Sequence, residues 1–248
     1  MTLLILTVLS MAAQSAPLVV AGTAEPPFKM YEGHRVIGID AQIMGRVLET
    51  LEIDYELHLL DSGSRMLREA EAGHIDVIMS LSYSEERAES LHYPNASYKQ
   101  LSWRFFIRTE DVGTITYSSL DDLKTWRIGA VQSWAYTPEF WAAPLNRMVV
   151  TDHRLLIDML LSGRIDMAPM SAAETLYLIR NRQVEGRLTF LDKPLSTRPY
   201  YNVFLKNSTH PDMPRLMSQY DRVIEELKAS GFIDQVYQEH LGVNASIN

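Results

Sequence analysis

The sequence contains no cysteine among its 248 residues. It therefore predicts no disulfide bond, no thiolate metal site, no cysteine nucleophile and no lipidated N-terminal cysteine. Positive charge is scarce as well, because 23 Lys and Arg stand against 31 Asp and Glu, for a net charge of −8. A nucleic-acid-binding protein carries a basic surface that displaces counterions from phosphate, so this balance argues against that class.

The usual catalytic and metal-binding patterns are missing too. The sequence has no GxSxG, HExxH, Walker or GxGxxG pattern. Its histidines are scattered, and no two of them have the i, i+4 spacing of a helical metal site. We therefore expect neither a metal ion nor a cofactor.

Long apolar runs are confined to the N-terminus. Residues 1–11 carry no charged side chain, and a small-residue segment, Ala12–Ala16, follows. This pattern is typical of a signal peptide and is too short to span a bilayer, although the positive residues that usually precede it are absent. A buried first strand is the alternative. We expect residues 1–16 to be a signal peptide, and the mature protein to be periplasmic and not a lipoprotein.

The rest of the chain has a globular balance, with 46% apolar and 22% charged residues overall. Short apolar runs that stop at turn residues predict strands, and apolar residues at helical spacing predict helices between them. Strands are expected at 18–22, 55–60 and 75–79, and helices at 38–51 and from Ser64, as N-cap, to Gly73. This alternation predicts an α/β fold with a parallel or mixed sheet.

The same pattern returns later in the chain. Ala72–Val77 (AGHIDV) resembles Ser162–Met167 (SGRIDM), because in each a glycine that can end a helix precedes a buried strand. The run 127–131 likewise resembles the opening strand, and a strand at 148–151 and a helix at 154–161 follow it. Two α/β units of similar design are the natural interpretation.

Two segments rich in strand-favouring aromatic residues, 101–108 and 200–206, lie where one unit gives way to the other. Amphipathic helices at 213–227 and 232–241 follow the second segment. If both segments cross between the units, the C-terminal helices rejoin the N-terminal unit and two lobes face each other across a cleft. The expected boundaries are 1–16 for the signal peptide, 17–106 and 204–248 for a discontinuous first lobe, and 107–203 for a continuous second lobe.

The segment Ser80–Arg87 (SLSYSEER) combines hydroxyl groups with a guanidinium at the end of a buried strand. The strand is expected to end at Ser80, and Ser82 and Ser84 follow at alternate positions. Ser84 can start a helix whose N–H groups point to the same space, and Arg87 adds a planar fork that can hold a carboxylate. Ligands of open α/β sheets collect at such strand ends. Helix capping with a surface Arg–Glu pair is an equally good interpretation of the spacing alone.

Several local patterns occur together in the order typical of one family. They are the opening strand before Pro-Pro-Phe, Gly38-x-Asp40, Gly73-x-x-Asp76, Ser80-x-Ser82-x-Ser84-x-x-Arg87, Tyr93-Pro94, Leu120-x-x-Leu123 to Gly129, and Gly163-Arg164-x-Asp166. From about residue 18 to 241, the sequence resembles the periplasmic solute-binding proteins of the polar amino-acid type, family 3 of the bacterial extracellular binding proteins. The resemblance implies a two-lobed α/β fold of the type II periplasmic binding proteins. Each lobe is a mixed sheet flanked by helices, two hinge strands cross between the lobes, and the lobes close on the ligand.

The resemblance also implies ligand-binding residues. Ser82 and Arg87 match the pair that binds the α-carboxylate of the ligand, and Ser80 matches a neighbouring contact. Trp134 is expected to line the cleft as a stacking surface, the alternative being that it packs under the second lobe. Phe28 is likewise expected as cleft wall rather than core.

The sequence departs from the family in four places. Glu25 stands where an aromatic residue usually covers the ligand, and Gly63 stands near the place of another lid aromatic. Trp134–Ala135 replaces a small hydroxyl pair, and Ser171 replaces the acidic residue that holds the α-ammonium. A buried ammonium needs a carboxylate nearby, and Glu25 could supply it. The alternative is that Glu25 is a solvated rim residue and that the ligand is an acid without an amine.

We therefore expect an exported monomer that captures a small carboxylate-bearing, amino-acid-like solute for an ABC importer of the inner membrane. A receptor that reports the ligand to a membrane signalling partner is the alternative. An enzyme on the same scaffold, such as a small-acid dehydratase, would need a cleft carboxylate as general acid or base, for which Glu25 and Glu174 are the candidates. Glu174 is otherwise expected to be an acid that the helix dipole favours in a first turn.

Overall fold

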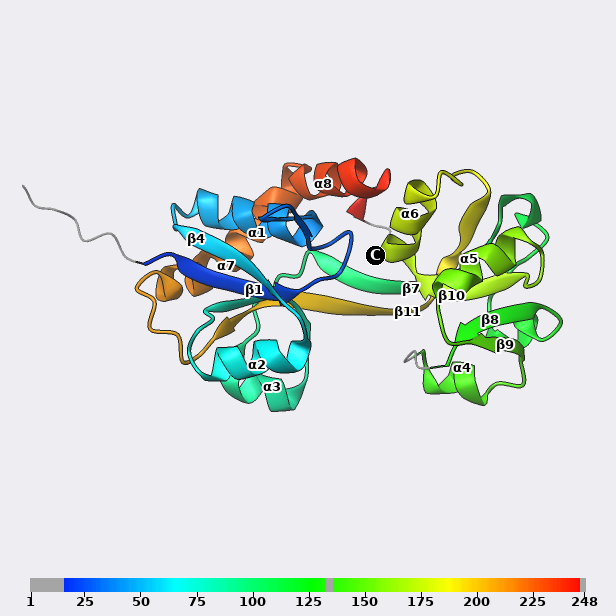
Figure 1. Cartoon of the computed structure of the whole chain (residues 1–248), viewed down its shortest axis with the longest axis horizontal. Coiled ribbons are helices and arrows are strands. Elements are labelled where there is room, and N and C mark those ends of the chain that lie inside the picture. Colours follow the sequence, from blue (N-terminus) through cyan, green and yellow to red (C-terminus); the bar gives the residue numbers. More distant parts are fainter. Residues whose placement is uncertain (1–15, 133–135, 246–248) are drawn as a thin grey trace, which may run out of the picture.

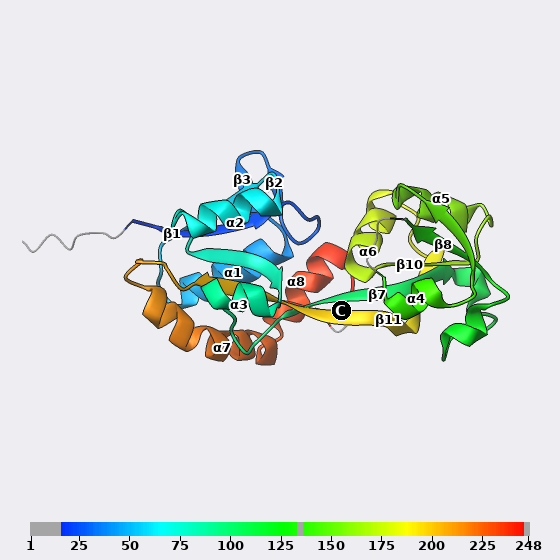
Figure 2. The same cartoon turned by 90° about the horizontal axis from the view of Figure 1, so that it is seen from below.

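The computed structural model describes residues 16–132 and 136–245 of the chain. They form two groups of helices and strands joined by two long neighbouring strands, β7 (Lys99–Arg108) and β11 (Leu188–Leu205), which Figure 1 and Figure 2 show from two directions. We call the elements before β7 and after β11 the first lobe, and the elements between them the second lobe. The expected signal peptide lies outside the described residues, except for Ala16.

One mixed sheet of nine strands runs through both lobes. Besides β7 and β11, its strands are β1 (Leu18–Thr23), β4 (Tyr55–Leu60), β5 (Val77–Ser82), β6 (Leu91–His92), β8 (Arg127–Val131), β9 (Asn146–Val150) and β10 (Met167–Ser171), while β2 (Met30–Glu32) and β3 (Arg35–Ile37) form a separate hairpin. The order is β4-β1-β5-β11-β7-β10-β8-β9, with β6 beside β11. Pairing is parallel within β4-β1-β5 and within β10-β8-β9, and β11 and β7 join these two parts by antiparallel pairing. The predicted α/β fold with a mixed sheet is confirmed.

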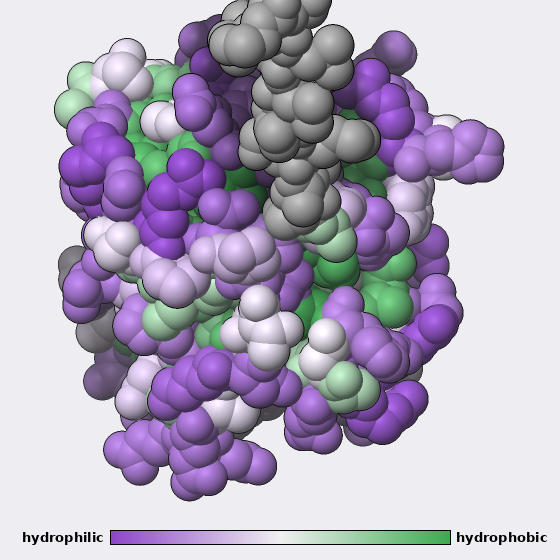
Figure 3. Space-filling model, turned by 90° about the vertical axis from the view of Figure 1, so that its left-hand side faces the viewer, coloured by the Kyte–Doolittle hydropathy of each residue, from purple (hydrophilic) through white to green (hydrophobic). Residues whose placement is uncertain are grey.

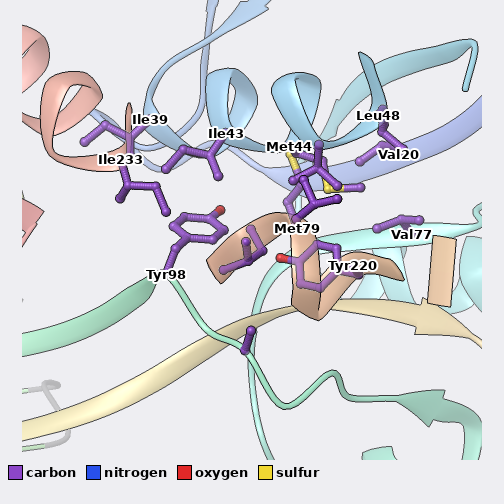
Figure 4. Packing of buried hydrophobic residues seen from close by; sticks show 14 of the residues in the cluster. Val20, Ile39, Ile43, Met44, Leu48, Val77, Met79, Tyr98, Tyr220 and Ile233 are labelled. Carbon is purple, nitrogen blue, oxygen red and sulfur yellow. The ribbon is translucent and has the colours of Figure 1, made fainter. Parts of the chain in front are cut away.

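Helices cover both faces of the sheet in the first lobe. They are α1 (Ile39–Thr50), α2 (Gly63–Glu71), α3 (Glu85–Ser90), α7 (Met213–Ala229) and α8 (Phe232–Leu241). α1, α7 and α8 pack together over one face, and Figure 4 shows their apolar side chains meeting those of the sheet around Tyr98 and Tyr220. α2 packs over the other face, where Met66 and Ile78 belong to a second cluster. Figure 3 shows the end of this lobe as a mostly hydrophilic surface with interspersed apolar areas.

The second lobe is built in the same way. Its helices are α4 (Pro138–Ala142), α5 (Arg154–Leu161) and α6 (Ala172–Asn181), with short 3₁₀ helices at Thr109–Asp111 and Leu120–Leu123. Adjacent residues of β7 point to opposite faces, so Phe105 packs in the cluster that contains Phe140 of α4, whereas Phe106 packs in the cluster that contains Leu156 of α5. Both faces of the sheet are therefore buried in this lobe, as expected for strands with continuous apolar runs.

The repeated Gly-x-x-Asp pattern gives each lobe an aspartate in the same role. Asp76, before β5, accepts the N–H of Val19 in β1 at 2.9 Å. Asp166, before β10, accepts the N–H of Arg127 in β8 at 2.8 Å. Each carboxylate thus ties the strand that it precedes to the neighbouring strand. The internal similarity of the sequence corresponds to one contact that occurs in both lobes.

The predicted start of α2 is wrong by two residues. The N-cap is Ser62 rather than Ser64, because Ser62 is extended and its hydroxyl accepts the N–H of Arg65 at 3.3 Å. The hydroxyl of Ser64 lies 3.3 Å from that of Ser62, inside the first turn of the helix. Both serines fit the pattern of a capping residue, and the backbone conformation decides between them.

Among the strand boundaries that differ from the prediction, two have a clear structural cause. β5 continues past Ser80, which has a φ of 61°, because Asn202 of β11 accepts the N–H of Ser80 at 3.1 Å and β11 pairs with β5 as far as Ser82. The second crossing strand begins at Leu188 instead of residue 200. Its prolines argue against a strand, but register shifts in its pairing with β7 accommodate the bend.

The first turn of α1 contains a carboxylate that solvent does not reach. Asp40 accepts hydrogen bonds from the ammonium groups of Lys29 at 3.1 Å and Lys99 at 3.3 Å, and from the hydroxyl of Tyr98 at 2.9 Å. Both lysines are 1% exposed. Burial alone raises the pKa of Asp40, but the attraction of Lys99 and Lys29 outweighs burial and holds the pKa below its ordinary value. A buried ion cluster therefore forms where the 24–29 segment, α1 and β7 meet.

Replacing Ser62 with alanine is expected to lower the free energy of unfolding by about 1 kcal/mol, because the N–H of Arg65 loses its acceptor. Ser64→Ala is the matched control and should change the free energy by less than about 0.5 kcal/mol. Urea unfolding followed by circular dichroism measures both variants. A larger effect of Ser64→Ala than of Ser62→Ala would contradict the assignment of the cap.

Asp40→Asn is expected to lower the free energy of unfolding at neutral pH by roughly 3–5 kcal/mol, because two buried ammonium groups lose a shared carboxylate. The folded-state pKa of Asp40 lies below the ordinary value of 3.8, so the unfolded chain takes up the proton first as the pH falls. The stabilisation from Asp40 is thus complete above that value and is lost below it. Denaturant unfolding across this pH range should show the difference between wild type and Asp40→Asn shrinking on acidification, and a constant difference would contradict the role of the charge.

Candidate functional site

A cavity of about 360 Å³ opens between the two lobes on one face of the crossing strands. We call it the interlobe cavity. Its lining combines two carboxylates, a guanidinium, an imidazole and three aromatic rings with smaller groups: Glu25, Pro26, Phe28, Leu101, Trp103, His153, Ser171, Glu174, Ser196, Arg198 and Tyr200. Both lobes and both crossing strands contribute, so the shape of the cavity depends on how the lobes are placed.

The floor of the interlobe cavity is formed by alternate residues of β7 and β11. Leu101 and Trp103 come from β7, and Ser196, Arg198 and Tyr200 come from β11. Leu101 lies opposite Arg198, and Trp103 lies opposite Ser196, so the two sets point to the same face. The register of the two crossing strands therefore brings these side chains together.

The wall on the side of the first lobe is a tight turn that follows β1. Glu25 and Lys29 exchange backbone hydrogen bonds of 2.8 and 3.0 Å across this turn. The start of α1 holds the turn from behind, because the N–H of Asp40 donates to the carbonyl of Phe28 at 2.8 Å. Gly38 permits this approach, since its φ is 116° and a Cβ there would lie 2.5 Å from that carbonyl oxygen. Backbone contacts thus set the position of the turn.

Glu25 faces the interlobe cavity, but its charge is already compensated. Its carboxylate lies 2.7 Å from the ammonium of Lys29 and 3.1 Å from that of Lys99, and its side chain is 38% exposed. Burial raises the pKa of Glu25, but Lys99 and Lys29 outweigh burial, and the pKa is lowered from its ordinary value. The ammonium of Lys99 also lies 3.4 Å from the ring centre of Phe28. A cation that enters the cavity would therefore meet a carboxylate that two ammonium groups already hold.

The pKa of Lys99 shifts in the opposite direction from that of Lys29. Burial lowers its pKa, and the attraction of Asp40 and Glu25 does not fully offset that effect. Lys29 is as deeply buried, yet there Asp40 and Glu25 outweigh burial and raise its pKa. The two ammonium groups and two carboxylates together carry no net charge.

The wall on the side of the second lobe is the start of α6. Ser171, just before the helix, is 4% exposed, and Glu174 lies in the first turn. The carboxylate of Glu174 lies 3.3 Å from Nε2 of His153. Burial raises the pKa of Glu174 above its ordinary value, and the attraction of His153 does not reverse this shift. The charge of Glu174 is thus less well compensated than that of Glu25.

α6 also touches the first lobe. Ala172 and Ala173 are buried within the first-lobe cluster beneath α1, α7 and α8. Arg180 donates to the backbone carbonyl of Glu239 in α8 at 3.2 Å. Figure 1 shows α6 and α8 facing each other beside the crossing strands. A contact between helices therefore joins the lobes in addition to β7 and β11.

Ser82 and Arg87 lie together at the end of β5. Nη1 of Arg87 donates to Oγ of Ser82 at 2.9 Å and to its carbonyl at 3.1 Å. Ser84 caps α3 as predicted, by accepting the N–H of Arg87 at 3.3 Å. Ser82 lies opposite Tyr200 in the pairing of β5 with β11, so its side chain points to the face of the interlobe cavity. Within the described residues Arg87 forms no ion pair, and its positive charge is therefore available.

The predicted ligand-binding residues fall into three groups. Those that line the interlobe cavity are Glu25, Phe28 and Ser171; those at the end of β5, outside the lining, are Ser80, Ser82 and Arg87; Trp134 lies outside the described residues. Phe28 is only 1% exposed and packs edge-on against Tyr237, so it is core as well as wall. The hydroxyl of Ser80 is buried without a hydrogen-bond partner among the described residues. These serine and arginine positions are close to the cavity, at one end of it.

Several residues that line the interlobe cavity were not predicted from the sequence. Trp103 and Tyr200 lie in the aromatic segments that were interpreted only as connectors, so a signal for them existed. Arg198 and His153 had no local signal, because their place in the cavity depends on strand register and on the packing of the second lobe. Within residues 16–132 and 136–245, no group of three or more potential metal ligands is found. None of the helices in those ranges is long and apolar enough to cross a membrane.

Solved structures of solute-binding proteins have the same fold. The L-cystine solute receptor of Neisseria gonorrhoeae, unliganded and open, matches with a TM-score of 0.78 at 16% identity, over 94% of this chain and 95% of that chain. Substrate-binding domain 2 of GlnP from Lactococcus lactis, also open, matches with a TM-score of 0.74 at 17% identity, over 93% and 99% of the two chains. An ancestral arginine-binding protein bound to arginine matches with a TM-score of 0.57 at 19% identity, over 90% and 97%. The predicted two-lobed type II fold is confirmed.

A comparison with curated proteins found no match. The family described as bacterial extracellular solute-binding proteins, family 3, matches residues 18–243. This range begins at the start of β1 and ends just after α8, so it includes both lobes and both crossing strands. The chain therefore belongs to family 3 of the bacterial extracellular solute-binding proteins, as its sequence patterns predicted.

Proposed function

We propose that this protein captures a small carboxylate-bearing, amino-acid-like solute in the interlobe cavity and delivers it to an ABC importer of the inner membrane. Its family consists of solute-binding proteins, and similar folds bind cystine and arginine, which supports a binding role rather than an enzymatic one. We place the protein in the periplasm as a monomer, with a transporter permease as its partner.

The proposal rests on the positive charge of Arg87, which no carboxylate of the described residues neutralises. Its guanidinium is held by two oxygens of Ser82, both neutral acceptors, and has no acidic partner among the described residues. Ser82 in turn points to the same face as Tyr200, which lines the interlobe cavity. A planar guanidinium with a free positive charge binds a carboxylate through two parallel hydrogen bonds. The carboxylate of the solute is proposed to bind there, beside the hydroxyl of Ser82.

The solute is proposed to be enclosed by bending of the two crossing strands. Residues 99–102 of β7 pair with residues 197–200 of β11, and further along β7 also pairs with β10 of the second lobe. We therefore place the bend a few residues before the expected boundaries, which are 17–106 with 204–248 for one lobe and 107–203 for the other. The TM-scores with the two open structures exceed the score with the arginine-bound structure, which supports an open form for this arrangement.

Arg87→Ala is expected to weaken binding by roughly 2–5 kcal/mol, because the solute carboxylate loses its charged partner. A thermal-shift screen of the common L-amino acids identifies the solutes that bind the wild type, and calorimetry then measures their affinity for both proteins. Arg68→Ala, which removes an exposed arginine of α2, is the matched control. Unchanged affinity in a folded Arg87→Ala variant would contradict the proposal that Arg87 binds the carboxylate of the solute.

Binding is also expected to make the molecule more compact, because the lobes bend toward each other at the crossing strands. Small-angle X-ray scattering of the wild type should show a smaller radius of gyration when an amino acid found in the screen is added to saturation. An amino acid that does not bind in the screen serves as the control. Binding without any change in scattering would show that the lobes are rigidly joined.

A further inference from the structure

The charges that face the interlobe cavity do not cancel. Arg198 projects from the floor on β11 and forms no ion pair with any residue that the structure describes. Arg87, at the first-lobe end of the same face, donates to the neutral oxygens of Ser82, lies beside the neutral hydroxyl of Tyr93, and forms no ion pair within those residues. The site therefore offers two guanidinium groups whose positive charge is not neutralised by the protein.

The acidic groups of the cavity balance only one of these charges. Glu25 belongs to the cluster with Lys29, Lys99 and Asp40, in which two ammonium groups face two carboxylates and the sum is zero. Glu174 is the remaining carboxylate of the lining, and its partner is the imidazole of His153 at 3.3 Å. Two free guanidinium groups against one such carboxylate leave an excess of one positive charge when His153 is neutral.

A solute enclosed by the lobes must match this excess, because closure removes water and an unpaired charge in a dry site is unfavourable. We propose that Arg198 binds a second anionic group of the solute, which therefore carries two acidic groups and one basic group, as a dicarboxylic amino acid does. Arg87 takes one carboxylate, Arg198 the other, and Glu174 faces the amine. The inference rests on the proposed function and names the substrate class of the same site.

The placement of Arg198 fits this role. It lies two residues before Tyr200 on β11, so the two side chains leave the same face of the strand roughly 7 Å apart. Tyr200 is the strand neighbour of Ser82, which holds Arg87. Arg198 thus extends from β11, and Arg87 extends from α3, directly after the neighbouring strand β5. Arg198 also lies in the segment proposed to bend, so a solute bound to it contacts the hinge as well as the lobes.

The test is isothermal titration calorimetry of the full-length protein with L-glutamate, L-aspartate, L-glutamine, L-asparagine and L-arginine. We expect the wild type to bind one dicarboxylic amino acid at least about tenfold more tightly than its amide, since a charge-assisted fork discriminates between them. Arg198→Gln should weaken binding of that acid by about tenfold or more and change binding of the amide by less than about threefold. Arg164→Gln removes the same charge from an exposed site outside the cavity lining and should leave both affinities unchanged.

Three outcomes would overturn the inference. If the wild type binds an amide or L-arginine more tightly than either acid, the cavity does not select a second anion, although the proposed function stands. If Arg198→Gln weakens the acid and the amide equally, Arg198 binds the carboxylate that they share. If neither these amino acids nor any in the thermal-shift screen bind, the proposed function itself fails, and the assignment of Arg198 fails with it.

Discussion

The ammonium group of Lys99 connects three parts of the protein that are distant in sequence. It contacts Glu25 in the turn after β1 and Asp40 in the first turn of α1, while its own backbone begins the first crossing strand. An ammonium at this depth is stable only while both carboxylates stay in place. The ring of Phe28, 3.4 Å from the ammonium, closes the cluster on the side of the cavity. The turn, the start of the helix and the first residue of the strand are therefore held together, and the first-lobe wall of the cavity is part of this contact.

The same ion cluster shows that contacts between distant residues cannot be inferred from the sequence. Glu25 alone is an acid at a strand end, and its sequence context suggests a free carboxylate that could hold an amine. Lys99 lies 74 positions further along the chain, and only the folded structure shows that it neutralises Glu25. Arg198 is a second example, because no local pattern identifies it as a cavity residue. Only its position opposite Leu101 in the paired strands directs its side chain into the cavity. By contrast, Ser82 and Arg87 are only five positions apart, and the sequence alone marks them as a pair.

The fold follows the same division between local and distant information. β4 (Tyr55–Leu60) and α5 (Arg154–Leu161) have the predicted bounds, because the alternation or spacing of their own apolar residues determines them. β11 does not have the predicted bounds, because its first half contains Pro194 and its sequence therefore predicts a loop. Only the pairing with β7 in the folded structure makes this half a strand. The N-cap of α2 differs for a related reason, since two nearby serines satisfy the same local rule. Tertiary pairing and backbone conformation decide the points that local chemistry leaves open.

The contact of α6 with the first lobe affects how far the lobes can separate. A wider separation of the lobes at α6 would bring Ala172 and Ala173 into water and break the bond from Arg180 to α8, both of which are unfavourable. This contact therefore opposes any opening of the lobes beyond the arrangement described above. Under the proposed function, an opening that is limited in this way would reduce the conformational entropy lost when the solute is captured.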